Sequence, residues 1–203
     1  MPDVYATARG RVLARLASPM AERARARRHE RFFALTGLQP GMRVVDVGCG
    51  ALGLRGLDPG LDVTGVDLVA RPEYPGTFVR ADAAQRLPFD DAAFDLAYSS
   101  SVVEHVEPER RAAFAAEVKR VARGWFVQTP AWSFPIEPHA LLPFAHWLAP
   151  TLRRPYCRLG AAGSWEDIHL LRRAELAALF GEPILAERFG GLVKSWIALR
   201  PVG

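Results

Sequence analysis

Glycines and an aspartate at the end of the first apolar run could bind a small charged ligand. Residues 43–49 read RVVDVGC, contain Asp46 and lead into the segment Gly48, Cys49 and Gly50. Glycine lets the backbone turn tightly and approach a ligand, and the amides of such a turn can donate to a carboxylate. Asp46 can pair with an ammonium group. The segment therefore suits a ligand that carries both groups, as an amino acid does.

Carboxylates also follow the next two apolar runs. Asp67 lies seventeen residues after Gly50 and ends the second run, and Asp82 follows the third. Asp67 could accept hydrogen bonds from both hydroxyls of a ribose. Asp82 and the amide of Ala83 could read the amino group and a ring nitrogen of adenine. Each acid alone is also common as a helix cap or turn residue, but three at successive strand ends predict a nucleoside ligand.

The glycine segment also satisfies a dinucleotide-binding pattern. Gly48, Gly50 and Gly53 have the spacing GxGxxG, which with Asp67 would suit NAD. Two observations weigh against NAD. Asp46 lies two residues before the first glycine, where a carboxylate suits an ammonium better than a pyrophosphate, and the remaining chain is short for a hydride-acceptor domain. A cofactor that joins a nucleoside to an amino acid, such as S-adenosylmethionine, fits better.

The elements that must position these residues are strands of a parallel sheet, because ligands bind outside the carboxyl ends of such strands. Apolar runs with the character of buried parallel strands cover residues 43–49, 62–68, 77–81, 94–101 and 125–129, with a helix at about 108–122. A further helix, RRAELAALF, precedes two runs at 183–189 and 194–200 that the Gly190-Gly191 turn joins as a hairpin. We predict an α/β fold: a Rossmann-like, doubly wound, mostly parallel seven-stranded sheet with an antiparallel C-terminal hairpin.

Length and composition predict one cytoplasmic domain. The chain has 203 residues, half of them hydrophobic, and no apolar stretch long enough for a membrane helix or a signal peptide. Its two cysteines, Cys49 and Cys157, do not have metal-ligand spacing, so we expect neither disulfides nor a zinc site. We divide residues 1–203 into four segments. These are N-terminal helices (1–40), a cofactor-binding core (41–130), an acceptor-covering insertion (131–171), and a C-terminal helix and hairpin (172–203).

Basic residues concentrate near the start of the chain, where the net charge of +4 largely originates. Residues 9–31 are rich in arginine and read as one or two helices. A solvated helical face is the simplest interpretation. The alternative is an arm that contacts an anionic substrate, a membrane surface or RNA.

Three sequence segments together resemble the cofactor-binding core of class I S-adenosylmethionine-dependent methyltransferases of the type 11 kind. They are VVDVGCG, GVDL and RADAAQRLPFDDAAFDLAYSSSVVEHV, which cover roughly residues 40–130. The resemblance implies that the glycine segment cradles the amino-acid part, Asp67 binds the ribose and Leu68 packs on adenine. It also implies that Ser100 lies beside the cofactor and that Glu104-His105-Val106 lies at the mouth of the acceptor site. With Asp46 added from the residue pattern, the predicted cofactor-binding residues are Asp46, Gly48, Cys49, Gly50, Asp67, Leu68, Asp82, Ala83 and Ser100.

Histidines are the candidate bases for removing a proton from the methyl acceptor. The sulfonium methyl is a good electrophile, so the protein mainly has to align a nucleophile and exclude water. A hydroxyl nucleophile also needs a base, for which His139, His105 and His169 are candidates. We favour His139, because its insertion is expected to lie over the crevice. An alternative is that His139 and Glu137 only brace the insertion by hydrogen bonds.

The insertion offers two further interpretations. Acid and imidazole side chains at Glu137, His139, Asp167 and His169 could hold a metal, but we prefer the bracing role and predict no metal. Aromatic side chains could line an apolar acceptor pocket or belong to the core, and these are Trp132, Phe134, Phe144, Trp147 and Trp165.

The sequence thus predicts an enzyme that transfers a methyl group from S-adenosylmethionine, with S-adenosylhomocysteine as product. We expect a small-molecule acceptor that is lipid-linked, a glycan or a secondary metabolite, methylated at oxygen. The alternatives are an RNA-directed methyltransferase that uses the arginine-rich segment and a non-catalytic S-adenosylmethionine-binding protein. As partners we expect the small acceptor rather than nucleic acid, with transient membrane-surface contact through the basic N-terminal helices.

Overall fold

The computed structural model describes residues 30–56, 58, 60–136, 141–159 and 168–203. The chain divides into two compact units. The first, which we call the sheet unit, contains Arg31–Ser133 and Ile168–Gly203, and the second, the insertion unit, contains Met1–Glu30 and Phe134–Asp167. The single domain of residues 1–203 stays a prediction.

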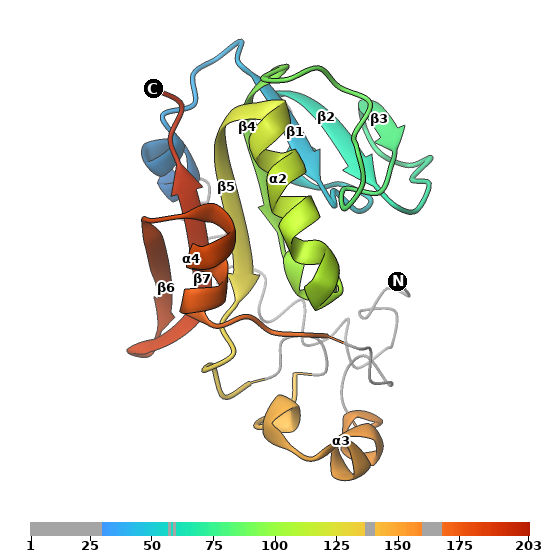
Figure 1. Cartoon of the computed structure of the whole chain (residues 1–203), viewed down its shortest axis with the longest axis vertical. Helices are drawn as coiled ribbons and strands as arrows, with labels where there is room; N and C mark the ends of the chain where they lie inside the picture. The colour runs from blue at the N-terminus through green and yellow to red at the C-terminus, as the bar shows by residue number, and fades with distance from the viewer. Residues whose placement is uncertain (1–29, 57, 59, 137–140, 160–167) are drawn as a thin grey trace, which may run out of the picture. The chain divides into compact units, whose positions relative to one another are not determined.

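A seven-stranded sheet forms the centre of the sheet unit (Figure 1). The strand order is β3-β2-β1-β4-β5-β7-β6, in which β1 to β5 are parallel and β7 runs antiparallel to both β5 and β6. This arrangement confirms the predicted Rossmann-like sheet with its C-terminal hairpin. The strands are β1 Arg43–Val47, β2 Asp62–Asp67, β3 Thr77–Arg80, β4 Phe94–Ser100, β5 Ala122–Pro130, β6 Ile184–Phe189 and β7 Leu192–Arg200.

Helices cover both faces of the sheet because successive strand residues point to opposite sides. In β1, Val45 and Val47 pack in one buried cluster and Val44 in another. The first cluster lies under helices α2 (Arg111–Val121) and α4 (Arg173–Phe180) (Figure 1). On the other face residues 31–36 are helical, and the ring of Phe32 meets those of Tyr98 and Phe126 edge-on at centroid distances of 5.4 and 5.3 Å.

The fifth strand begins earlier than its sequence suggests. The apolar run predicted a strand at 125–129, whereas β5 already begins at Ala122. Gly124 pairs with Leu96 of β4, and a Cβ at Gly124 would lie 2.7 Å from the carbonyl oxygen of Arg200 in β7. Glycine is therefore required here by close packing of the backbones, which a period of apolar residues does not reveal.

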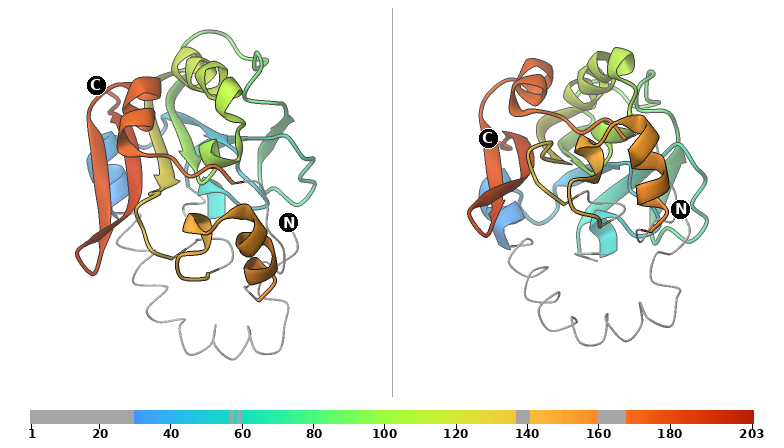
Figure 2. Two further views of the ribbon diagram at one scale, coloured as in Figure 1. Left: turned by 60° about the horizontal axis from the view of Figure 1, so that its bottom comes forward. Right: turned by 90° about the horizontal axis from the view of Figure 1, so that it is seen from below.

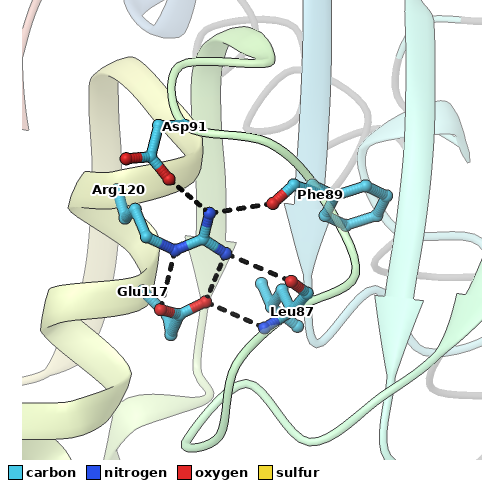
Figure 3. Close-up of polar contacts among 5 residues, drawn as sticks. All are labelled: Leu87, Phe89, Asp91, Glu117 and Arg120. Carbon is cyan, nitrogen blue, oxygen red and sulfur yellow. Dashed lines mark hydrogen bonds and ion pairs between the residues drawn. The ribbon is translucent and has the colours of Figure 1, made fainter.

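An arginine on α2 fixes the connection between β3 and β4 (Figure 3). The Arg120 guanidinium donates to the carbonyl oxygens of Leu87 and Phe89 at 3.1 and 2.8 Å, and to the carboxylates of Asp91 and Glu117 at 2.7 to 2.9 Å. The Glu117 carboxylate also accepts from the Leu87 amide at 2.8 Å. We call these five residues the Arg120 cluster. The cluster anchors residues 87–91, near the start of β4, whereas Asp82 lies at the other end of the connection, just after β3.

The insertion unit contains short helices that the sequence did not predict. They are η4 (Ala145–Trp147) and α3 (Pro150–Cys157), and α3 escaped prediction because it is short and contains Pro155. Ala145 and Cys157 are buried with Leu142 and Tyr156 packed against them. His139 lies outside the described residues. Among the described residues, no helix is long and apolar enough to cross a membrane.

Candidate cofactor site

The glycine segment after β1 is tied to the end of β2. The parallel register pairs Val47 with Val66, so both strands end at the same edge of the sheet (Figures 1 and 2). The amides of Gly48 and Cys49 donate to the carbonyl oxygen of Val66 at 2.7 and 3.2 Å. The Gly50 amide donates to the Asp67 carboxylate at 3.0 Å. Residues 48–53, which we call the glycine loop, are thereby held against the strand that bears the predicted ribose-binding acid.

Two positions in this loop require glycine. Gly48 has φ +78°, and a Cβ there would lie 2.2 Å from Cγ2 of Val102. Gly53 has φ +51°, and a Cβ there would lie 2.1 Å from the Oδ2 atom of Asp46. Gly53 therefore makes room for the Asp46 carboxylate, a role that the GxGxxG spacing does not reveal.

Asp46 lies beneath the glycine loop with an unusual acidity. Its side chain is buried, with 2% of the residue exposed, and Oδ2 accepts a hydrogen bond from the Leu54 amide at 2.6 Å. Burial raises the pKa of Asp46 to about 7, and the nearby charge of Asp67 adds to this effect, while the Leu54 hydrogen bond opposes it. No residue in the described part of the chain forms an ion pair with Asp46. A cation close to this carboxyl group would favour its ionised form.

Asp67 and Leu68 present a carboxylate beside apolar surface. The Asp67 carboxylate accepts from the amides of Gly50 and Val69 at 3.0 and 2.9 Å, and Arg71 donates to it at 3.3 Å. The next side chains along the chain are open to solvent, since Leu68 is 63% and Val69 is 55% exposed. The arrangement suits a ribose on the acid and a flat base on Leu68.

Asp82 is held by an arginine that sequence reasoning missed. Its Oδ1 atom accepts from the Ala84 amide at 2.9 Å, and Oδ2 accepts from Gln85 at 3.2 Å and from Arg110 at 2.6 Å. Burial alone would raise the pKa of Asp82, but the Arg110 and Ala84 hydrogen bonds outweigh it and lower that pKa. Arg110 belongs to the turn η3 (Pro108–Arg110), and its distance of 28 residues from Asp82 left no signal in the sequence.

Cys49 takes part in the loop through its backbone amide and through its thiol, which donates to the Gly50 carbonyl oxygen at 3.4 Å. Its side chain packs with Tyr74 against Gly65 of β2, where a Cβ would lie 2.6 Å from the Tyr74 ring and 2.8 Å from Sγ of Cys49. Burial raises the pKa of the Cys49 thiol to about 12, and Asp46 and Asp67 add to the effect. The thiol is therefore neutral and is not a nucleophile.

The residues after β4 divide between buried and accessible groups. Ser100 is the last residue of β4 and is half-buried. Glu104, in the turn η2 (Val103–His105), is fully buried and accepts from the Thr129 hydroxyl at 3.0 Å. Its carbonyl oxygen accepts from the His169 amide at 2.9 Å. His105 is half-buried, so of the predicted acceptor-site segment it is His105, and not Glu104, that solvent can reach.

Of the other groups predicted in the insertion, the structure describes only some, and among these the rings of Phe144 and Trp147 lie 5.4 Å apart. Glu137, His139, Asp167 and Trp165 lie outside the described residues. Trp132 belongs to the sheet unit, where the Arg172 guanidinium lies 3.8 Å from its ring centroid, whereas Phe134, Phe144 and Trp147 belong to the insertion unit. The aromatic acceptor pocket stays a prediction. No group of metal ligands is found in the part of the chain that the structure describes.

A hollow of about 340 Å³ lies at the opposite edge of the sheet, at the amino ends of its strands. Arg43, Asp62 and Phe94, which begin β1, β2 and β4, line it together with residues 88–90. We place the site at the carboxyl edge despite this hollow. The glycine loop and the three acids lie there, and parallel α/β sheets bind ligands at that edge.

Comparison with known proteins identifies a methyltransferase region in the chain. Residues 45–126 match the family model described as methyltransferase domain. No curated protein sequence matches the chain.

Solved structures share the fold. A protein from Pyrococcus horikoshii is 16% identical, covers 98% of this chain and 93% of its own, and has a TM-score of 0.59. An S-adenosylmethionine-dependent methyltransferase from Methanosarcina mazei is 18% identical and has a TM-score of 0.54, and the match covers 80% of this chain and 92% of the Methanosarcina chain. The Burkholderia thailandensis 1,6-didemethyltoxoflavin-N1-methyltransferase, solved with 1,6-didemethyltoxoflavin and S-adenosylhomocysteine, is 18% identical with 78% and 69% coverage and a TM-score of 0.50.

Proposed function

We propose that this S-adenosylmethionine-dependent methyltransferase, whose methyltransferase domain spans residues 45–126, methylates an oxygen atom of a small-molecule acceptor. The acceptor classes are a lipid-linked molecule, a glycan and a secondary metabolite. The observation that carries the cofactor assignment is the hydrogen bond between the Gly50 amide and the Asp67 carboxylate, because it joins the loop for an amino acid to the acid for a ribose.

Each part of the cofactor has a proposed place at the carboxyl edge. The glycine loop receives the amino-acid part, with its amides directed to the carboxylate and Asp46 to the ammonium. Asp67 accepts from the ribose hydroxyls and Leu68 packs on adenine. Asp82 accepts from the adenine amino group, and the Ala83 amide donates to a ring nitrogen. Ser100, at the end of β4, lies beside the cofactor.

The chemistry asks little of the protein beyond alignment and removal of one proton. When bound, S-adenosylmethionine supplies an electrophilic methyl group. The site would hold the acceptor oxygen in line with that methyl group, and a histidine would accept the proton that the oxygen gives up. His139 and His105 are the proposed bases, and His105 is the one that the structure describes, half-buried as the last residue of η2.

The Burkholderia neighbour gives independent support for a small acceptor, because its structure contains the small molecule that it methylates beside S-adenosylhomocysteine. The test is transfer of labelled methyl from S-adenosylmethionine into separate lipid, glycan, metabolite and RNA fractions of a cell extract. Label in one of the first three supports the proposal. Label in RNA alone contradicts the acceptor class, and bound cofactor with no label in any fraction supports a non-catalytic binding protein.

The two bases can be separated with paired variants. His139→Ala and His105→Ala should each be assayed with the labelled acceptor and titrated with S-adenosylhomocysteine. Loss of a general base lowers kcat by about a hundredfold or more and leaves cofactor affinity unchanged. A variant that keeps full kcat excludes that histidine as the base.

A further inference from the structure

The insertion unit carries a concentration of exposed apolar side chains. Among the described residues, eleven large apolar side chains are exposed, and six of these lie in the short segments 134–136 and 141–159. Proteins seldom expose apolar surface of this density unless it meets a partner or a membrane. The six are Ile136 at 40%, Leu141 at 59%, Phe144 at 52%, Trp147 at 42%, Leu152 at 61% and Leu159 at 79% exposure.

Hydrogen bonds and a small buried cluster hold the segment that presents these side chains. Phe144 donates its amide to the Pro135 carbonyl oxygen at 2.5 Å, and its ring lies 5.4 Å from that of Trp147. The Arg153 guanidinium donates to the Leu148 carbonyl oxygen at 2.9 and 3.2 Å. The Tyr156 hydroxyl donates to the Pro143 carbonyl oxygen at 3.3 Å. The apolar side chains are therefore displayed from a folded segment.

The charges in the described segments 134–136 and 141–159 have one sign. Arg154 lies on α3 and Arg158 directly follows this helix, and both side chains are exposed. Arg153 also lies on α3. Residues 134–136 and 141–159 contain no aspartate or glutamate. Cationic side chains beside exposed tryptophan, phenylalanine and leucine are the composition that binds the interface of an anionic lipid layer. A negatively charged surface is complementary to this segment, whereas a neutral apolar protein surface would offer no opposite charge to Arg154 and Arg158.

The geometry points to contact with a membrane surface. We propose that the six apolar side chains, with Arg154 and Arg158, form a lipid-binding face that docks on an anionic bilayer. The eight residues of α3 are far too few to span it, so the face would lie in the interface. The inference rests on the proposed function in one respect: among the three acceptor classes it selects the lipid-linked one, because only that acceptor resides at a membrane.

The test is co-sedimentation of the full chain with two kinds of vesicle, phosphatidylcholine alone and phosphatidylcholine mixed with phosphatidylglycerol. The wild type should bind the anionic vesicles more tightly, and added salt should weaken binding. Arg154→Gln with Arg158→Gln should lower partitioning about twenty-fivefold, since each arginine near an anionic surface contributes roughly a fivefold factor. Arg86→Gln, at an exposed arginine of the sheet unit, is the matched control and should bind as the wild type.

A second pair of double variants tests the apolar contribution to vesicle binding. Phe144→Ser with Leu152→Ser should lower partitioning more than tenfold. Phe189→Ser with Leu192→Ser, two similarly exposed residues of the β6–β7 hairpin, should not change it. Circular dichroism and titration with S-adenosylhomocysteine show that each variant is folded.

Three results would overturn the lipid-binding face. The first is absence of vesicle binding by the wild type. The second is unchanged vesicle binding by both insertion variants, which would place the contact elsewhere. The third is loss of self-association by these variants with no effect on vesicle binding, which would make the face a contact between copies of this chain. Methyl transfer to a lipid without vesicle binding would reject only this inference. Vesicle binding without methyl transfer would reject only the proposed function.

Discussion

Glu117 in the Arg120 cluster and Asp46 at the acidic edge of the sheet are both carboxyl groups withdrawn from solvent, and their pKa values shift in opposite directions. In the cluster, Arg120 makes five hydrogen bonds, and those to Glu117 lower the pKa of that carboxyl group despite its burial. At the acidic edge, formed by Asp46, Asp67 and Asp82, burial raises the pKa of Asp46 to about 7. In the cluster one arginine bonds to both carboxylates, whereas the acidic edge contains a carboxyl group that is costly to ionise.

This difference separates what holds the fold from what can bind a ligand. All five N–H groups of Arg120 donate to groups of the cluster, so this guanidinium stabilises the connection between β3 and β4 and has no donor left for a ligand. A buried carboxyl group with a raised pKa is costly to ionise unless a ligand of opposite charge pairs with it. Such groups are typical of binding sites. The two regions should therefore respond differently to the same kinds of substitution.

The largest expected effect is on stability, in the Arg120 cluster. Arg120→Ala leaves Glu117 without its main partner and frees the carbonyl oxygens of Leu87 and Phe89, so the free energy of unfolding should fall by about 3 kcal/mol. Urea unfolding measures this loss. Below the unfolding transition, affinity for S-adenosylhomocysteine should be unchanged. An unaltered stability together with lost affinity would break the distinction between the two regions.

The next effect is the pH dependence that Asp46 confers. Because its pKa is raised in the fold, the stability from its protonated form is present at low pH and is lost as pH rises from about 4 through 7. Pairing with a ligand ammonium requires the ionised form. Affinity for S-adenosylhomocysteine should therefore fall about tenfold as pH drops from roughly 8 to 6. Calorimetry across this range checks it, and Asp46→Asn should remove the dependence; a dependence that persists in the variant would exclude Asp46 as its source.

A smaller effect is expected at Arg110, which holds Asp82 at the edge of the site. Its side chain is 41% exposed, so we expect no change in the unfolding midpoint of Arg110→Ala. Cofactor affinity should fall about fivefold, because Asp82 loses the charged partner that orients it. Arg123→Ala is the matched control, since Arg123 is also exposed and pairs with Asp95 away from the site. Equal effects of the two variants would remove Arg110 from the site.

The smallest expected effect tests the apolar surface beside Asp67. Leu68→Ala should weaken S-adenosylhomocysteine about threefold by reducing contact with adenine. Leu192→Ala, at a leucine of similar exposure in the β6–β7 hairpin, should have no effect. Tighter binding by the Leu68 variant would contradict packing on the base.

Sequence patterns predicted the sheet well because buried parallel strands are short apolar runs with acids or glycines at their ends. The extension of β5 through Gly124 was missed, since contact between two backbones leaves no apolar period. The helix α3 was missed because Pro155 interrupts its helical pattern.

At the candidate site, the sequence indicated which acids are involved but not how they are held. The link from Arg110 to Asp82 and the space that Gly53 provides for Asp46 depend on segments that only the fold brings together. The predicted base His139 lies outside the described residues, so its role stays a prediction.

The most direct test of the account is calorimetric titration of the purified chain with S-adenosylmethionine, S-adenosylhomocysteine and NAD in parallel. The account predicts micromolar binding of the first two, about −8 kcal/mol, and no heat from NAD. Binding of NAD alone would contradict the assignment of the acidic edge to S-adenosylmethionine.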